Sequence, residues 1–175
     1  MAAMKKFLVI GNMNAITYKE VFPFIKDNKM WTGFKHFGGG MNMIQNKETF
    51  DESKTKSFSI NENGEIIKNI MGCIWFTNLE HNKRHEQIDL YKHYSPEEYP
   101  KYDNYDAIEV SKVCEIPMDY DGVMGVPITF LGKYCPEQFE IIGIDRYVEN
   151  NPNYGHRFNL NGKEVYARIL IRIKK

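Results

Sequence analysis

The sequence predicts an α/β fold in which short strands outnumber helices. Three observations carry this prediction: apolar runs of strand length, a helix-like segment between the first two runs, and an Asn-Gly turn late in the chain. Continuous apolar runs are typical of strands buried on both faces, as in a parallel sheet. An Asn-Gly pair between two strand-like segments is typical of a β-hairpin.

The first predicted strand covers residues 7–10 and ends at a Gly-Asn pair. Thr17 has the features of a helix N-cap, with Glu20 three residues later as its capping-box partner. Pro23 is unfavourable inside that helix, so we expect a kink or an early end. Residues 30–34 form the next predicted strand. A strand, a helix and a second strand in this order favour a right-handed parallel crossover.

The middle of the chain is more polar. Residues 38–64 contain a glycine triplet and few apolar side chains, which indicates a long mobile connection or a connection that carries a hairpin. Residues 74–77 predict a strand. Residues 81–106 are polar and rich in tyrosine, so we expect irregular structure with a helical turn.

The last third predicts strands at residues 128–131 and 139–143. The chain then ends in a predicted hairpin, with arms at 158–160 and 165–173 and a turn at 161–162. In the second arm Ala167, Ile169, Ile171 and Ile173 are expected to face one way, and Arg168, Arg172 and Lys174 the other. With no repeat and no clear linker, residues 1–175 are expected to form a single domain.

The composition is that of a globular protein, with 42% hydrophobic and 26% charged residues. Its 23 basic and 23 acidic side chains cancel, which weakens a nucleic-acid assignment but leaves room for a local basic patch. Cys73, Cys114 and Cys135 are expected to be free buried thiols in a reducing compartment. No apolar run approaches a membrane span, so we expect a soluble cytoplasmic protein.

Several segments, in the same order, resemble the EcoRI-type adenine-specific DNA methyltransferases. The matching segments are residues 7–20, 75–81, 83–86, 99–108, 122–131, 136–141 and 166–171. In that family an Asn-Pro-Pro-Phe segment holds the methyl-transfer residues and precedes the matched part. This chain contains no such segment. The resemblance therefore implies the carboxyl-terminal half of such an enzyme, with part of a Rossmann-like mixed sheet.

The resemblance implies that the intact enzyme transfers a methyl group from S-adenosylmethionine to adenine N6 in DNA, within a restriction–modification system. Phe37-Gly38-Gly39-Gly40 lacks the following helix that a cofactor loop needs. Asn151-Pro152-Asn153-Tyr154 is the nearest approach to the catalytic tetrad, and a surface turn explains it better. We therefore assign no catalytic residue, and we expect this chain alone to bind S-adenosylmethionine weakly or not at all and to transfer no methyl group.

Asn12 and Asn14 follow the first predicted strand. By analogy with the family, they lie at the carboxyl end of a sheet strand, the end that lines the ligand crevice in open α/β sheets. They are therefore candidates for the rim of that crevice. The alternative is that both asparagines only shape a turn.

Lys83 and Arg84, with His81 and His85 beside them, form a small basic cluster near aromatic residues. Such a cluster is suited to holding DNA phosphates or stacking on bases, and a plain solvated loop is the alternative. The two histidines are spaced like a metal pair. Only cations and an asparagine lie between them, however, so we expect no metal site.

Tyr102, Asn104 and Tyr105 belong to a segment that concentrates aromatic rings, amides and carboxylates. Asparagine pairs in a bidentate way with adenine, and the same residues also form ordinary Asx turns. The resemblance favours a loop that faces DNA.

Two functional alternatives stay open at this stage. The chain is either part of an adenine methyltransferase, supplying a sheet edge and a DNA-binding surface, or a non-catalytic DNA- or partner-binding module derived from one. Its partners would be DNA and either a missing amino-terminal half or a second copy, because an uncovered sheet edge favours pairing.

Overall fold

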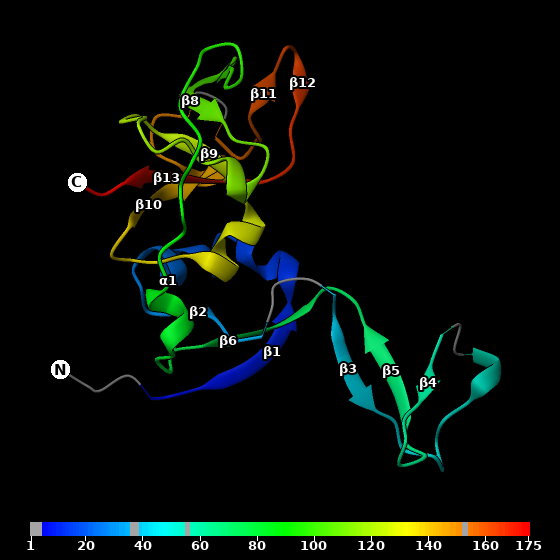
Figure 1. Ribbon diagram of the computed structural model, residues 1–175. Coiled ribbons are helices and arrows are strands. Elements are labelled where there is room, and N and C mark those ends of the chain that lie inside the picture. Colours follow the sequence, from blue (N-terminus) through cyan, green and yellow to red (C-terminus); the bar gives the residue numbers. More distant parts are fainter. Residues whose placement is uncertain (1–4, 36–38, 55–56, 152–153) are drawn as a thin grey trace.

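The computed structural model describes residues 5–35, 39–54, 57–151 and 154–175. Strands arranged in separate small sheets dominate these residues, and helical structure is limited to short segments (Figure 1). The expectation of a mixed, strand-rich α/β chain is confirmed at this level.

The amino-terminal sheet has the order β1-β6-β2, formed by β1 (Leu8–Asn12), β6 (Cys73–Thr77) and β2 (Trp31–Thr32). Both outer strands are antiparallel to β6, so β1 and β2 run in the same direction. The chain passes between them through η1 (Met13–Thr17) and α1 (Phe22–Lys26). The predicted crossover therefore joins two co-directional strands of one sheet, but β6 lies between them.

The predicted position of the helix start was wrong. Thr17 is the last residue of η1, where its hydroxyl donates to the backbone oxygen of Asn14 at 2.9 Å. The α-helix begins only at Phe22, and Pro23 lies in its first turn. A proline is favourable there because the first helical N–H groups have no partner within the helix.

The predicted burial of the first strand was also wrong for this chain. Leu8, Val9 and Ile10 are 53%, 48% and 44% exposed. Consecutive side chains of a strand point to opposite faces, so both faces of β1 are open. The physical reason is that β1 is an edge strand and the described residues leave about half of each of these side chains uncovered.

Residues 38–64 contribute to a second sheet rather than a plain connection. Its order is β3-β5-β4, with β3 (Met41–Ile44), β5 (Ile66–Ile70) and β4 (Ser59–Ile60) all antiparallel, and η2 (Glu52–Lys54) between β3 and β4. This sheet projects from the body as an arm (Figure 1). The β4–β5 pair confirms the alternative that included a hairpin.

The third sheet forms the upper part of the body in Figure 1. Its order is β10-β13-β9-β8-β7, made by β10 (Phe139–Ile144), β13 (Arg168–Ile173), β9 (Met124–Pro127), β8 (Tyr105–Glu109) and β7 (Lys101–Tyr102). The β8–β9 pair is parallel, and the other pairs are antiparallel. The strands predicted at 74–77 and 139–143 are thus confirmed.

The strand predicted at 128–131 was wrong, because these residues begin the 3₁₀ segment η5 (Ile128–Lys133). The strand ends one position earlier, at Pro127, which has no N–H to continue a ladder. The apolar run is nevertheless buried at Phe130 and Leu131. Thr32 donates its hydroxyl to the Leu131 oxygen at 3.1 Å and so ties η5 to β2.

The hairpin turn was predicted correctly, but its second arm was not. Asn161 and Gly162 have φ of 51° and 74° between β11 (Asn159–Leu160) and β12 (Lys163–Glu164). Positive φ at both positions is the type I′ requirement that favours Asn-Gly. However, β13 pairs with β10 and β9, and not with β11.

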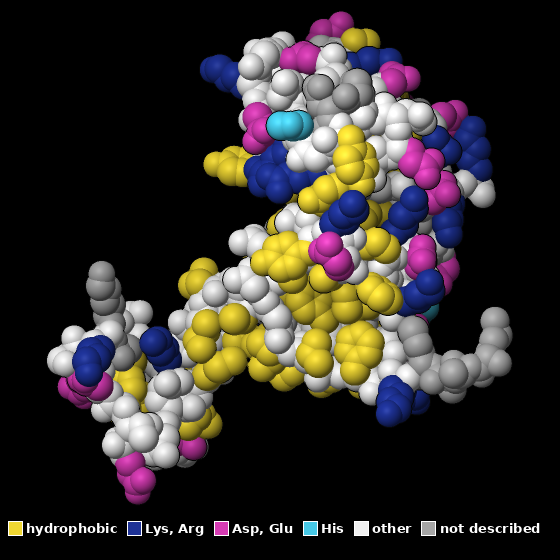
Figure 2. Space-filling view, turned by 180° about the vertical axis from the view of Figure 1, so that it is seen from behind, with side chains coloured by type: hydrophobic (Ala, Val, Ile, Leu, Met, Phe, Trp, Pro, Cys, Tyr) yellow, Lys and Arg dark blue, Asp and Glu magenta, His cyan; other side chains and the backbone are white. Residues whose placement is uncertain are grey.

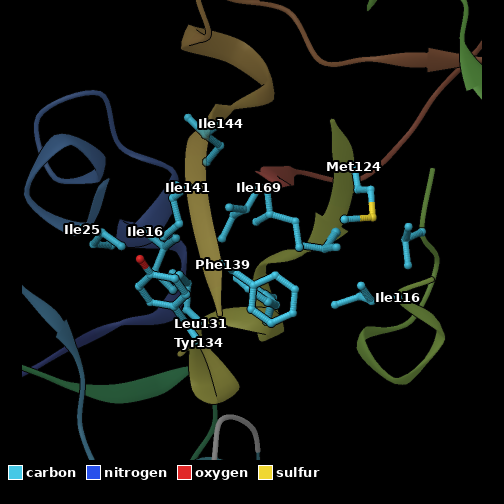
Figure 3. Close-up of a cluster of buried hydrophobic side chains, with 14 of the residues drawn as sticks. Ile16, Ile25, Ile116, Met124, Leu131, Tyr134, Phe139, Ile141, Ile144 and Ile169 are labelled. Carbon is cyan, nitrogen blue, oxygen red and sulfur yellow. The ribbon is translucent and has the colours of Figure 1, made fainter. Parts of the chain in front are cut away.

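The alternation predicted in that last strand is confirmed for Ile169, Ile171 and Ile173, which share one core, and for Arg172, which is exposed, but β13 is also buried on its other face at Leu170. Ile169 and Ile171 belong to the larger core, together with Phe130 and Phe139. Figure 3 shows Ile169 and Phe139 in this core. Leu170 belongs to a smaller core on the other face, which also holds Tyr102, Ala107, Val148 and Phe158. An interior strand with a core on each side must be apolar in succession.

The remaining 3₁₀ segments are η3 (Asn82–His85), η4 (Val113–Glu115) and η6 (Asp145–Tyr147). The first of these is the helical turn expected within residues 81–106. All three cysteines are free, as predicted. The prediction that all three are buried was wrong, because Cys135 is buried, Cys73 is half-buried and Cys114 is exposed. No helix among the described residues is long and apolar enough to span a membrane.

Candidate functional site

Arg84 is buried, although the sequence suggested a surface cation. Its guanidinium carbon lies 3.6 Å from the centroid of the Trp31 ring. The same group donates to the Glu80 carboxylate at 3.1 Å and to the Asn28 side chain at 3.2 Å. Trp31 in turn donates its indole N–H to the Leu79 oxygen at 2.9 Å. Arg84 is therefore engaged in holding η3 against β2, and this geometry favours a structural role over contact with a phosphate.

Lys83 is placed differently from its neighbour. Its ammonium donates to the Phe34 backbone oxygen at 3.3 Å and lies 5.9 Å from the centroid of the Phe34 ring. Within the described part of the chain it has no carboxylate partner. Lys83 also lies at the rim of an open hollow of about 670 Å³, lined by Leu8, Gly33, Phe34, Lys35 and Trp75. Its charge is therefore available to an anion at this edge.

The two histidines of the cluster face different partners. His81 makes a 3.1 Å hydrogen bond to the Thr32 oxygen through Nε2, and its ring meets Phe34 edge-on. His85 lies between the carboxylates of Glu137 and Glu80, at 3.0 and 3.3 Å. Hydrogen bonding to Glu137, and then to Glu80, raises the pKa of His85 above its ordinary value. The described residues contain no group of three or more side chains suited to a metal ion.

Tyr102 is also buried, in a polar network inside the five-stranded sheet. Its hydroxyl donates to Glu109, and Glu109 accepts three contacts from Arg168 at 2.6 to 3.0 Å. Burial, followed by the neighbouring Glu109 charge, raises the pKa of Tyr102 well above its ordinary value. The ring packs over Gly125, where no Cβ would fit. Tyr102 is thus placed to support the sheet, away from any surface that DNA could reach.

Asn104 and Asp103 tie this turn to the terminal hairpin. The Asn104 oxygen accepts from the Asn159 N–H at 2.9 Å, and its amide donates to the Arg157 oxygen at 3.3 Å. The Asp103 carboxylate accepts the backbone N–H groups of both residues of the hairpin turn, at 3.2 and 2.7 Å. These contacts join segments far apart in the sequence, so they are not the local Asx turns of the alternative interpretation, but they do commit both side chains to internal structure.

Tyr105 keeps one side open. One face of its ring stacks on Phe158, with centroids 4.8 Å apart and planes inclined by 17°. The residue also lines a cleft of about 540 Å³ between α1 and β10, which the sequence did not predict. Lys19 and Lys26 share this cleft with Glu140, Glu149 and Asp27, so its charge is mixed. Its lining comes from segments far apart in the sequence, and no local motif marks it.

Asn12 and Asn14 lie where β1 ends, as predicted. Asn12 is the N-cap of η1, and its side-chain oxygen accepts the Asn14 N–H at 2.8 Å. Both residues are exposed. This geometry supports the turn-shaping alternative, and it leaves the Asn14 side chain at the surface beyond the strand.

The two motifs considered for cofactor and catalysis lie partly outside the described residues. Positions 37–38 of the glycine triplet segment and positions 152–153 of the tetrad-like segment are not described. Asn151, which is described, is buried and donates its side-chain amide to the Asp145 oxygen at 2.7 Å. That contact fits a residue that fixes a turn.

Comparison with known proteins decides the family. The model of the family described as adenine-specific methyltransferase EcoRI matches residues 1–174. The chain belongs to this family. It is 47% identical over 173 residues to the Type II methyltransferase M.EcoRI of Escherichia coli, covering 98% of this chain and 51% of the relative. It is also 34% identical over 181 residues to the Type II methyltransferase M.MpnI of Mycoplasma pneumoniae, covering 56% of that relative.

The chain spans about half the length of the curated relatives it matches. The predicted resemblance to the carboxyl-terminal half of EcoRI-type methyltransferases is confirmed. No solved structure matches the chain.

Proposed function

We propose that this chain acts as the carboxyl-terminal half of an adenine-N6 DNA methyltransferase of a restriction–modification system. It supplies a sheet edge and part of the surface that holds DNA. The observation that carries the proposal is the match over residues 1–174, combined with coverage of only 51% of M.EcoRI. The β1-β6-β2 sheet would then be part of a larger Rossmann-like sheet.

The residues present do not fit S-adenosylmethionine. In the described part of the chain no glycine-rich turn leads from a strand into an α-helix. The cleft of about 540 Å³ between α1 and β10 has one lining glycine, Gly143, and the place of its Cβ is taken by Val148 at 2.8 Å. That glycine serves internal packing and does not cradle a ligand. We therefore place the cofactor site and the catalytic residues in the part of the family that this chain does not match.

Contact with DNA is assigned to fewer residues than the sequence suggested. Lys83 and Tyr105 each leave an exposed portion beside a hollow, and Asn14 stays exposed beyond β1. Arg84, Tyr102 and Asn104 are committed to internal contacts. We propose that these three position the surface and that Lys83 supplies a phosphate contact.

Salt-dependent DNA binding tests this assignment. Lys83→Ala should weaken binding to duplexes of every sequence alike and lower the salt slope by about one, because one phosphate contact is lost. Lys163→Ala, an exposed lysine in the β11–β12 hairpin, is the matched control and should leave the slope unchanged. An identical slope for Lys83→Ala and the unmodified chain would remove Lys83 from the DNA surface.

The alternative function is a binding module that transfers no methyl group in any assembly. The absence of an Asn-Pro-Pro-Phe segment from the sequence is the observation that favours it. A chain that binds DNA but gives no activity when the rest of the family fold is supplied would support this alternative.

A further inference from the structure

Strand β1 combines three features that rarely occur together at a protein surface. Leu8, Val9 and Ile10 form a continuous apolar run, and all three are about half exposed, which opens both faces of the strand. In addition, no described strand pairs with the outer edge of β1. A free edge beside apolar faces is a liability that folded proteins normally cover.

The apolar surface continues beyond β1. Phe34 is 66% exposed, and with Leu8 and Trp75 it lines the open hollow of about 670 Å³. Leu79, two residues after β6, adds another exposed side chain. Hydrophobic side chains also gather between the projecting arm and the amino-terminal end in Figure 2. We call Leu8, Val9, Ile10, Phe34 and Trp75 the β1 surface.

The continuous apolar run of β1 indicates what kind of segment would cover the β1 surface. A continuous apolar run is typical of an interior strand with a layer on each side. Such a strand needs a neighbour along its free edge and cover for both faces, which requires a sizeable folded segment. The curated relatives contain enough chain for one, because about half of each lies outside the match.

A second copy of this chain satisfies the requirement less well. Two β1 strands pairing edge to edge would complete the backbone hydrogen bonds of both. Val9 and its neighbours would still be open on both faces, since a single added strand covers neither. The surface therefore fits a layered partner better than a twin strand.

We propose that β1 is an interior strand of a larger sheet. Its partner is the polypeptide corresponding to the half of the family outside the match, which pairs with the free edge of β1 and buries the β1 surface. This inference rests on the proposed function for the choice of partner. It holds whether that polypeptide is joined to this chain or separate from it.

The test mixes this chain with the unmatched half of the Escherichia coli relative and measures association by sedimentation velocity. We expect a one-to-one complex. Amide hydrogen exchange should slow at residues 8–12 on mixing, because new backbone hydrogen bonds form along β1. Slower exchange of these amides distinguishes two modes of binding, because pairing along the edge of β1 forms new backbone hydrogen bonds and docking on a face of the sheet does not.

Val9→Asp is the disrupting variant, and Ile60→Asp is its matched control, because Ile60 is 64% exposed in the arm. Val9→Asp should weaken association at least about 100-fold, since it buries an uncompensated charge, while Ile60→Asp should not. Val9 is already half exposed, so the free variant should melt like the unmodified chain.

Three results would overturn the inference: no complex, a complex equally tight with Val9→Asp, or a homodimer through β1 in place of the complex. Methyl transfer by the mixture is measured separately. A complex that protects β1 but transfers no methyl group would contradict the proposed function and leave the interface standing.

Discussion

The network of Arg168, Glu109 and Tyr102 offers the sharpest test of how the five-stranded sheet is held. The Arg168 and Glu109 side chains are only 12% and 5% exposed, and they meet at 2.6 Å. Arg168→Met removes the cation but keeps an apolar side chain of similar length. The Glu109 carboxylate would then be buried with the Tyr102 hydroxyl as its remaining donor in the network.

The magnitude follows from that burial. Removing one partner of a buried ion pair costs about 3–5 kcal/mol, because the other charge is left uncompensated. This is a large share of a total stability of about 5–15 kcal/mol. For a chain of this size it lowers the melting temperature by roughly 6–20 °C.

Urea unfolding followed by circular dichroism measures the loss. The combined variant Arg168→Met, Glu109→Leu and Tyr102→Phe replaces the whole network with apolar groups and should recover most of the stability. The reasoning would be refuted if Arg168→Met lowered the free energy of unfolding by less than about 1 kcal/mol. It would also be refuted if the combined variant were as unstable as Arg168→Met, because the buried, unpaired Glu109 charge would then not be the cause of the loss.

Two titration experiments extend these predictions. Burial raises the pKa of Asp145 to about 6 from its ordinary 3.8, so its proton stabilises the fold at low pH and this contribution is lost as pH rises through about 6. Asp145→Asn should therefore stabilise the chain by up to about 3 kcal/mol near pH 8 and by little near pH 4, as urea unfolding at both pH values would show; an equal effect at both would contradict the assignment. Glu137→Gln should lower the pKa of His85 toward its ordinary value, because the Glu137 hydrogen bond is the largest cause of its rise. NMR titration of the His85 ring measures this pKa, and Glu62→Gln in the arm is the control. An unchanged His85 pKa in Glu137→Gln would refute the contact.

The sequence predicted the features that depend on neighbouring residues. Apolar runs located β1, β6 and β10, and the Asn-Gly pair located the β11–β12 turn. These signals are local because a run of strand formers, or two residues that tolerate positive φ, restricts the backbone by itself.

Features that depend on distant partners were missed. Arg168 meets Glu109 from 59 positions away, and Arg84 meets Asn28 from 56 positions away. Nothing near these residues in the sequence reveals that their charges are buried. The same holds for β13, whose pairing with β9 and β10 gives it a core on each face.

The two cations of the basic cluster also depend on distant partners. Neighbours in the sequence, they have opposite environments in the structure, since Arg84 stacks on Trp31 and Lys83 stays at the rim of the hollow. The exposure of β1 could not be foreseen from an apolar run, which indicates burial. Its cover is absent from the described residues, and the relatives contain about as much chain again as the part matched here.

Methyl transfer by a chimera tests the central claim most directly. The unmatched half of the Escherichia coli relative is joined to this chain in place of the matched half, and radiolabelled methyl transfer from S-adenosylmethionine to duplex DNA is measured. The account predicts N6-methyladenine from the chimera and no transfer by this chain alone. Transfer by the chain alone, or a folded chimera that binds DNA without transfer, would contradict it.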